Sequence, residues 1–96
     1  MVPPGFVAAG VACGMKATGV LDLGVLASLR PTTSGMVDTT SALPAAPVQR
    51  NRNLRRGAVR AVVVNAGKAN AATGAVGLED AHEMGRRAAD GLGVAA

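Results

Sequence analysis

The chain has 96 residues, enough for one small domain, and we treat residues 1–96 as a single unit. Hydrophobic residues make up 49% of it and the formal net charge is +4, but Phe6 is the only aromatic residue and most of the apolar residues are alanine and valine. A core of such small side chains suits tight backbone packing inside a larger assembly. The single cysteine, Cys13, excludes an internal disulfide and favours a reducing compartment, most simply the cytoplasm.

The apolar stretch from Val2 to Val11 does not have the features of a targeting or membrane segment. It lacks a basic start, contains Pro3 and Pro4, and is too short to cross a bilayer. We therefore expect no targeting segment here and no membrane partner.

The first half of the chain predicts a β-hairpin. Residues 5–15, GFVAAGVACGM, are apolar with glycines between them, which favours a buried strand with a close backbone neighbour. Residues 21–29 alternate between leucine, valine or alanine and a second set that includes Asp22 and Ser28, which predicts a half-buried strand. Residues 16–20 are short enough to turn the first strand back on the second.

The middle of the chain is expected to be less regular. Threonine and valine in residues 32–41 suit a third, exposed strand, and Pro44 and Pro47 should then end regular structure. Residues 49–57, QRNRNLRRG, form either one or two helical turns or a basic loop that Gly57 closes.

Half of the ten basic residues lie in one acid-free segment: Arg50, Arg52, Arg55, Arg56 and Arg60. Clustered arginines can bind phosphates, so a small stand-alone basic binding protein that uses this patch is an alternative function. No aromatic residue lies among them to stack on bases, which argues against a nucleic-acid partner. A solvated basic face is the more common explanation of such a patch.

The last third predicts a strand, a loop and a helix. Residues 58–64 are a β-branched run of the kind buried on both faces. Residues 78–92 carry one apolar stripe at helical spacing, and Gly91 or Gly93 should end this helix. The predicted fold class is α/β or α+β, a partial sheet of three to four strands followed by a strand–loop–helix unit. A further strand would normally return beside 58–64, so we expect an incomplete fragment of a larger layered fold with an open sheet edge.

The loop after this strand, NAGKANAATG, contains the candidate binding residues Asn65, Gly67 and Asn70. Its small residues let the backbone approach a ligand or a neighbouring strand, while the two asparagines fix the turn through side-chain hydrogen bonds. A structural turn and a ligand-facing loop explain this pattern equally well. A phosphate-binding loop does not, because Val62 stands where its first glycine is needed and Ala69 where a serine or threonine is needed.

Two residues with reactive side chains carry no recognisable catalytic or metal pattern. His82 has no second histidine or cysteine at metal-ligand spacing, so a solvated helix residue is the favoured interpretation. Cys13 lies in an apolar strand without a nearby base, which predicts a buried, inert thiol. We therefore expect no catalytic residue, no metal ligand and no cofactor in this chain.

Three stretches of the sequence carry a family resemblance: GFVAAGVACGMKATGVLDLGVLASL, AAPVQ and RAVVVNAGKANAATGAVGLEDAHEMGRRAADGLGV. In this order they resemble the opening of the bifunctional ornithine acetyltransferase and N-acetylglutamate synthase family. The resemblance implies a cytoplasmic enzyme of arginine biosynthesis that moves acetyl from N-acetylornithine to glutamate. It also implies a precursor that cleaves itself before a threonine nucleophile, leaving two kinds of chain that stay associated.

The chain departs from the family pattern at several positions. Ala66 and Lys68 replace the serine and asparagine of the usual NSGNANA, and Asp38 stands near a usual phenylalanine. Ala96 precedes the Thr-Gly oxyanion segment, the substrate-binding lysine and the nucleophile that the resemblance implies. The resemblance thus implies an N-terminal fragment that is inactive alone and whose partners are the rest of the first chain, the threonine-started second chain and the two substrates.

Overall fold

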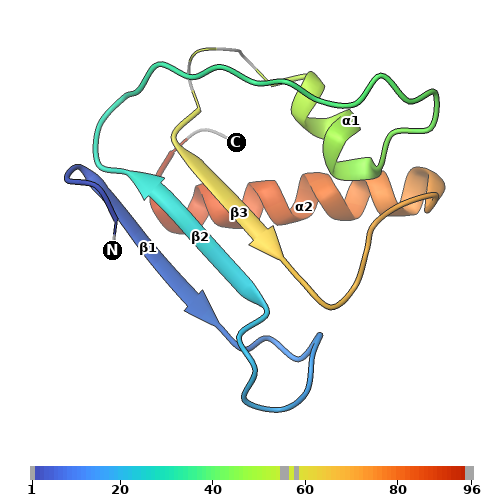
Figure 1. The fold of residues 1–96 in the computed structure, drawn as a ribbon, viewed down its shortest axis with the longest axis horizontal. Helices are drawn as coiled ribbons and strands as arrows, with labels where there is room; N and C mark the ends of the chain where they lie inside the picture. Colours follow the sequence, from blue (N-terminus) through green and yellow to red (C-terminus); the bar gives the residue numbers. More distant parts are fainter. Residues whose placement is uncertain (1, 55–56, 58, 95–96) are drawn as a thin grey trace.

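The computed structural model of the protein describes residues 2–54, 57 and 59–94. Along the chain its elements are β1 (Phe6–Val11), β2 (Leu23–Ser28), α1 (Ala46–Arg52), β3 (Ala61–Asn65) and α2 (Gly74–Leu92). Figure 1 shows the three strands side by side, with α2 passing behind β3 and α1 next to α2, to one side of the strands. The predicted α+β class, a partial sheet with a final strand–loop–helix unit, is confirmed.

The sheet has the order β1-β2-β3, and both pairs of neighbours are antiparallel. The predicted hairpin is confirmed, with Val11 opposite Leu23, but its connection spans 12–22 rather than 16–20. The prediction that its first strand is buried is wrong, because all six residues of β1 are exposed and no helix packs against this edge strand. Ala61 of β3 lies opposite Ala27. The strand begins at Ala61, and Ala58, where we placed its start, lies outside the described residues.

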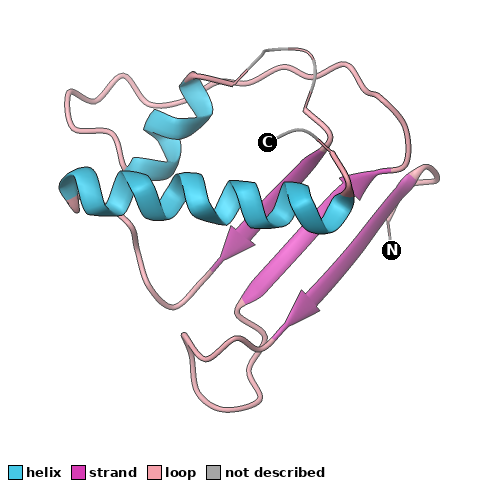
Figure 2. Ribbon diagram, turned by 180° about the vertical axis from the view of Figure 1, so that it is seen from behind, coloured by secondary structure: helices cyan, strands magenta, loops and turns pink. Residues whose placement is uncertain are grey.

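The helices cover only part of one face of the sheet. α2 lies behind the sheet and packs against β3, α1 packs against α2, and all six residues of β1 remain exposed (Figure 2). The buried apolar residues of the described chain are all alanines: Ala27, Ala46, Ala81 and Ala89. This confirms the expectation of a core made of small side chains. The prediction that the last strand is buried on both faces is not met within this chain, because Val62 and Val64 are exposed.

Contrary to our prediction, Pro44 and Pro47 do not end regular structure, because α1 begins at Ala46, between them. Pro47 lies in the first turn of α1, where a fixed φ suits the helix and the missing N–H has no helical acceptor to lose. The helix ends at Arg52, so the helical alternative for residues 49–57 is confirmed only for its first part.

The predicted third strand at residues 32–41 is wrong, because that segment has no regular structure. Both edges of β2 are already taken by β1 and β3, so the segment that follows β2 has no place beside it. The segment is instead attached at single points. Thr32 donates its hydroxyl to the carbonyl of Val59, and Asp38 forms an ion pair with Arg52 at 2.7 Å.

α2 is longer than the sequence pattern predicts, since it begins at Gly74 rather than Leu78. It ends as expected: Gly93 has a φ of 69°, and the N–H of Val94 donates to the carbonyl of Ala89 at 3.0 Å. Within the described ranges, no helix combines the length and the apolar character needed to cross a bilayer.

Candidate functional site

Two loops meet at one end of the sheet. Residues 12–22 connect β1 to β2, and residues 66–73 connect β3 to α2. The N–H of Ala66 donates to the carbonyl of Asp22 at 2.9 Å, which ties the second loop to the first. This junction contains the candidate residues Asn65 and Gly67, so its geometry decides what these residues can do.

Asp22 organises the first loop. It is 3% exposed, and its carboxylate accepts backbone N–H groups from Cys13 at 2.6 Å, Met15 at 2.7 Å and Lys16 at 3.0 Å. These hydrogen bonds, the one from Cys13 foremost, hold the pKa of Asp22 well below its ordinary range. The sequence pattern placed Asp22 on the polar face of a strand, but β2 begins only at Leu23. The missed signal is an acidic residue directly after a glycine-containing loop whose N–H groups need an acceptor.

Asn65 and Gly67 hold the second loop against the first. The side-chain amide of Asn65 donates to the carbonyl of Lys68 at 3.2 Å and lies 3.4 Å from the sulfur of Met15. Gly67 has a φ of 96°, and a Cβ added there would stand 3.0 Å from the carbonyl oxygen of Met15. Position 67 therefore requires glycine both for its backbone conformation and for the close approach of the two loops.

Asn70 fixes the start of α2. Its side-chain amide donates to the carbonyl of Gly77 at 2.7 Å, and its side-chain oxygen accepts the hydroxyl of Thr73. Its own carbonyl accepts the N–H of Ala46 at 3.2 Å, which joins the loop to α1. The structure thus gives Asn65 and Asn70 the turn-fixing role that the sequence allowed. The main chain, the small side chains and the exposed side chain of Lys68 are then the groups that the loop can offer to a ligand.

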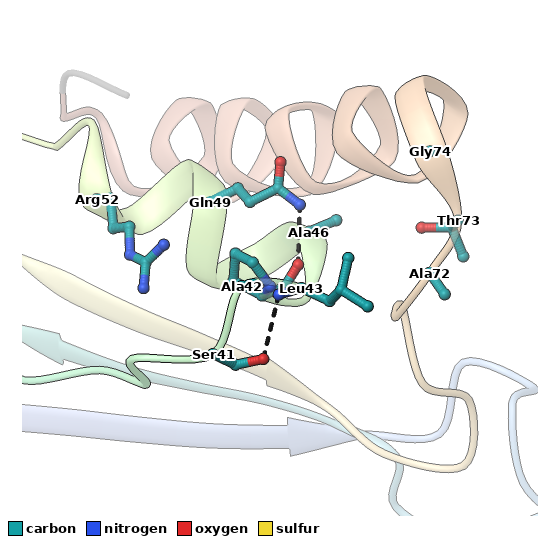
Figure 3. A pocket seen from close by; sticks show the side chains of 10 residues that line it. Ser41, Ala42, Leu43, Ala46, Gln49, Arg52, Ala72, Thr73 and Gly74 are labelled. Atoms are coloured by element: carbon teal, nitrogen blue, oxygen red, sulfur yellow. Dashed lines mark hydrogen bonds between the residues drawn. The ribbon is translucent and has the colours of Figure 1, made fainter.

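A groove of about 520 Å³ lies beside this loop, between α1, the start of α2 and residues 41–44 (Figure 3). Its polar lining side chains have partners within the protein: Gln49 donates to the carbonyl of Pro44 at 2.9 Å, and Arg52 to Asp38 at 2.7 Å. Ala72, which also lines the groove, has a left-handed φ of 54°, a conformation uncommon for a residue with a side chain. The groove can take a small polar molecule, but its lining has no nucleophile beside a base.

The two side chains that carried no chemical pattern in the sequence lie in different environments. Cys13 is exposed, so our prediction of a buried thiol is wrong. The nearby carboxylate of Asp22 raises the pKa of this thiol, mainly through a side-chain hydrogen bond, which favours the unreactive protonated form. His82 is half-buried on α2. Among the described residues, no three His, Cys, Asp or Glu side chains are grouped as a metal site would need.

The arginine segment is not one solvated basic face. Arg50 lies over Gly85 of α2 with a buried Nε that has no acceptor, and Arg60 donates to the carbonyl of Ser28 at 3.2 Å. With Arg52 paired to Asp38, the three described arginines of the segment contact three different parts of the chain, while Arg55 and Arg56 lie outside the described residues. This scatter gives no support to a basic binding surface.

Comparison with known proteins gives consistent matches over nearly the whole chain. The model of the ArgJ family matches residues 7–96. The arginine biosynthesis bifunctional protein ArgJ of Bacillus licheniformis is 45% identical over 94 residues, covering 96% of this chain and 23% of that protein. ArgJ of Gloeobacter violaceus is 47% identical with the same coverage, and mitochondrial ArgJ of Penicillium rubens is 45% identical over 20% of its length. The chain thus spans about a quarter of these relatives.

Two solved structures share the fold. The crystal structure of ArgJ from Bacillus halodurans matches with a TM-score of 0.86 and 34% identity, over 96% of this chain and 49% of that one. The ornithine acetyltransferase of Mycobacterium tuberculosis, solved with ornithine, matches with a TM-score of 0.77 and 44% identity, over 84% of this chain and 43% of that one. The ArgJ family model matches residues 7–96, which contain every described helix and strand apart from Phe6, the first residue of β1. The chain therefore belongs to the ArgJ family.

Proposed function

We propose that the chain forms the opening part of an ornithine acetyltransferase that moves acetyl from N-acetylornithine to glutamate in arginine biosynthesis. The observation that carries this proposal is the match to the ornithine-bound acetyltransferase of Mycobacterium tuberculosis, at 44% identity over 84% of this chain. The chain's partners would be the rest of the enzyme, including the chain that carries the nucleophile. We place the complex in the cytoplasm because a chain with a single cysteine, which cannot form an internal disulfide, suits a reducing compartment.

Within that enzyme, we assign the chain a supporting rather than a chemical role. Acyl transfer needs a nucleophile within hydrogen-bond reach of a base. Cys13 is a poor candidate because its pKa is raised, which keeps the thiol protonated. The nucleophile and its oxyanion donors would then come from outside these residues.

The loop from Asn65 to Asn70 is the part that we propose faces the substrate. Support comes from the two asparagine side chains, which fix the backbone of this loop from both ends. The close approach at Gly67 holds it against the 12–22 loop. A loop held this firmly can present its main-chain N–H and C=O groups to a small polar ligand in a fixed geometry.

A chimera tests the proposed function. These 96 residues would replace the matching part of Bacillus licheniformis ArgJ, to which they are 45% identical, and transfer of acetyl from N-acetylornithine to glutamate would be measured. We expect transfer by the chimera and none by the isolated chain. A folded but inactive chimera would contradict the proposal, and transfer by the isolated chain would contradict the supporting role.

The substrate-facing loop can be tested at Lys68 in the same chimera. Its side chain is exposed, and only its carbonyl accepts the bond from Asn65, so Lys68→Asn should change stability by less than about 0.5 kcal/mol. If the loop faces substrate, this change should alter KM for N-acetylornithine severalfold while thermal stability stays constant. Arg30→Asn, at an exposed basic residue after β2 at the other end of the sheet, is the matched control and should leave KM unchanged. Equal KM values for all three proteins would remove the loop from the substrate site.

A further inference from the structure

The junction of the 12–22 and 66–73 loops carries the only lysines of the chain, Lys16 and Lys68. It lies at the end of the sheet where β1 and β3 finish (Figure 1). Both lysine side chains are exposed. A Cβ added at Gly67 would stand 2.7 Å from the Cγ of Lys16, so the stem of Lys16 rests on the residue directly before Lys68. Two ammonium groups that are far apart in the sequence are therefore attached at neighbouring points, one on each loop.

Neither lysine has an anionic partner within the described part of the chain. The described ion pairs use Arg52, Arg86 and Arg87 instead. The one acidic residue of the two loops, Asp22, is 3% exposed, and its carboxylate accepts three main-chain N–H groups. The charge that this junction presents to the solvent is therefore positive, and an anion from outside can approach both lysines.

The main chain that carries the two lysines is held in place. The N–H of Lys16 donates to the carboxylate of Asp22 at 3.0 Å, and the carbonyl of Lys68 accepts the side-chain amide of Asn65 at 3.2 Å. Because the points of attachment are fixed, an anion that binds here orders only the two side chains and not the loops. An ammonium group is a compact charge with three donors, which suits a carboxylate oxygen approached from several directions.

We propose that Lys16 and Lys68 form a carboxylate-binding site that favours glutamate over ornithine as the acetyl acceptor. The proposal rests on the function proposed above. Glutamate has two carboxylates, which two ammonium groups can bind separately, and a net negative charge. N-acetylornithine has one carboxylate and no net charge, while ornithine, left after the acetyl group has moved, is a cation that the lysines repel. Lys68 stands where the compared NSGNANA pattern has asparagine, so its charge is an addition to that pattern.

Charge-removing variants of the Bacillus licheniformis chimera test this selection. Lys16→Met and Lys68→Met remove the ammonium group and keep an apolar stem. The double variant should raise KM for glutamate on the order of tenfold or more and KM for N-acetylornithine by a smaller factor, because glutamate loses two charged contacts. Arg30→Met, which removes one exposed charge at the other end of the sheet, and Lys68→Arg, which keeps the charge, are the controls and should retain the KM for glutamate.

Binding to the full 96-residue chain gives a second measurement that needs no activity. Glutarate, a dicarboxylate, is titrated while the amide signals of Gly67 and Lys68 are followed by NMR, with the uncharged glutaramide and inorganic phosphate as comparison probes. Glutarate should cause saturable shifts that weaken with added salt and that the double variant loses. Glutaramide should cause none, and Arg30→Met should bind glutarate as the unchanged chain does.

The absence of saturable shifts with glutarate, or tighter binding of phosphate than of glutarate, would overturn the proposal. Equal rises in KM for glutamate from Lys68→Met and Arg30→Met would also overturn it, because net charge alone would then explain the effect. An inactive chimera, together with glutarate binding at the lysines of the 96-residue chain, would reject only the proposed function. An active chimera whose KM for glutamate is the same in the double variant would reject only the lysine site.

Discussion

The two long connections of this protein are built in opposite ways. Residues 12–22 surround a buried carboxylate, that of Asp22, which accepts three main-chain N–H groups. Residues 29–45 are attached mainly through side chains near the surface, such as the pair between Arg52 and Asp38. The difference shows that a segment without helix or strand can still be well ordered. A loop becomes well defined when its main-chain donors share one buried acceptor, because charged hydrogen bonds out of water are stronger than those at the surface.

This contrast has a consequence for the candidate site. The loop that holds Asn65 and Gly67 rests on the 12–22 connection, through the bond from Ala66 to the carbonyl of Asp22 and the close contact with Met15. The groove near Thr73 has residues 41–44 as one wall, and these belong to the weakly attached connection. One side of the site is therefore preorganised, while the other can adapt its shape.

Asp22→Ala is the strongest test of the difference between the 12–22 and 29–45 connections. The change leaves the N–H groups of Cys13, Met15 and Lys16 without their acceptor. We expect the folding equilibrium constant to fall on the order of a hundredfold, measured by urea unfolding of the isolated chain. Asp80→Ala, an exposed acidic residue of α2, is the control and should have little effect. Equal losses from the two variants would mean that the buried carboxylate does not organise the loop.

Acid should release the same interaction without a mutation. The pKa of Asp22 is lowered in the folded protein, so the unfolded chain binds its proton at a higher pH than the folded chain does. The stability that the carboxylate contributes is therefore present above the unfolded pKa of about 3.9 and is lost as pH falls toward the folded pKa. Urea midpoints measured from pH 6 to pH 2 should fall more steeply for the unchanged chain than for Asp22→Asn. Parallel curves would contradict this assignment.

Gly67→Ala tests the contact between the two loops. The new side chain would need a left-handed backbone and would press on the carbonyl of Met15, so we expect a loss of about 1–3 kcal/mol in the free energy of unfolding. Gly19→Ala is the matched control, since Gly19 has a similar φ of 82° but open space around it. The excess loss at position 67 measures the loop contact apart from the backbone strain. Equal losses at the two positions would show that the contact contributes nothing.

The elements that local pattern determines were predictable from the sequence. The alternation in residues 21–29, the valine run that ends at Asn65 and the stop at Gly93 each depend on neighbouring residues only. The structure has all three, with the first strand of these shortened to Leu23–Ser28. The predicted strand at 32–41 failed because a β-prone segment becomes a strand only where it pairs with a neighbour, and this segment is held instead by side-chain contacts such as those of Thr32 and Asp38. Pairing between distant segments is invisible in local composition.

The position of the candidate site in the chain was predictable from the sequence, but the contacts that hold its loop in place were not. The small residues and asparagines after β3 marked the loop, and the roles of Asn65 and Asn70 in fixing it follow from their side-chain chemistry. Asp22 was missed because its burial depends on where β2 begins and on donors several residues away. The contact between Gly67 and Met15 joins residues far apart in sequence, and no periodicity encodes such a pair.

The smallest expected effect comes from Arg52→Ala, which removes the main described anchor of the weakly attached connection. The side chains of Arg52 and Asp38 are 37% and 23% exposed, and water competes for both, so the folding equilibrium constant should change by about fivefold or less. Added salt should shrink the effect further, whereas it should leave that of Asp22→Ala unchanged. The local effect should be larger than the global one, because residues 39–43 would exchange their amide hydrogens faster while the amides of β2 do not. A loss as large as that from Asp22→Ala would show that the two connections depend on equally strong anchors, and the contrast between them would then fail.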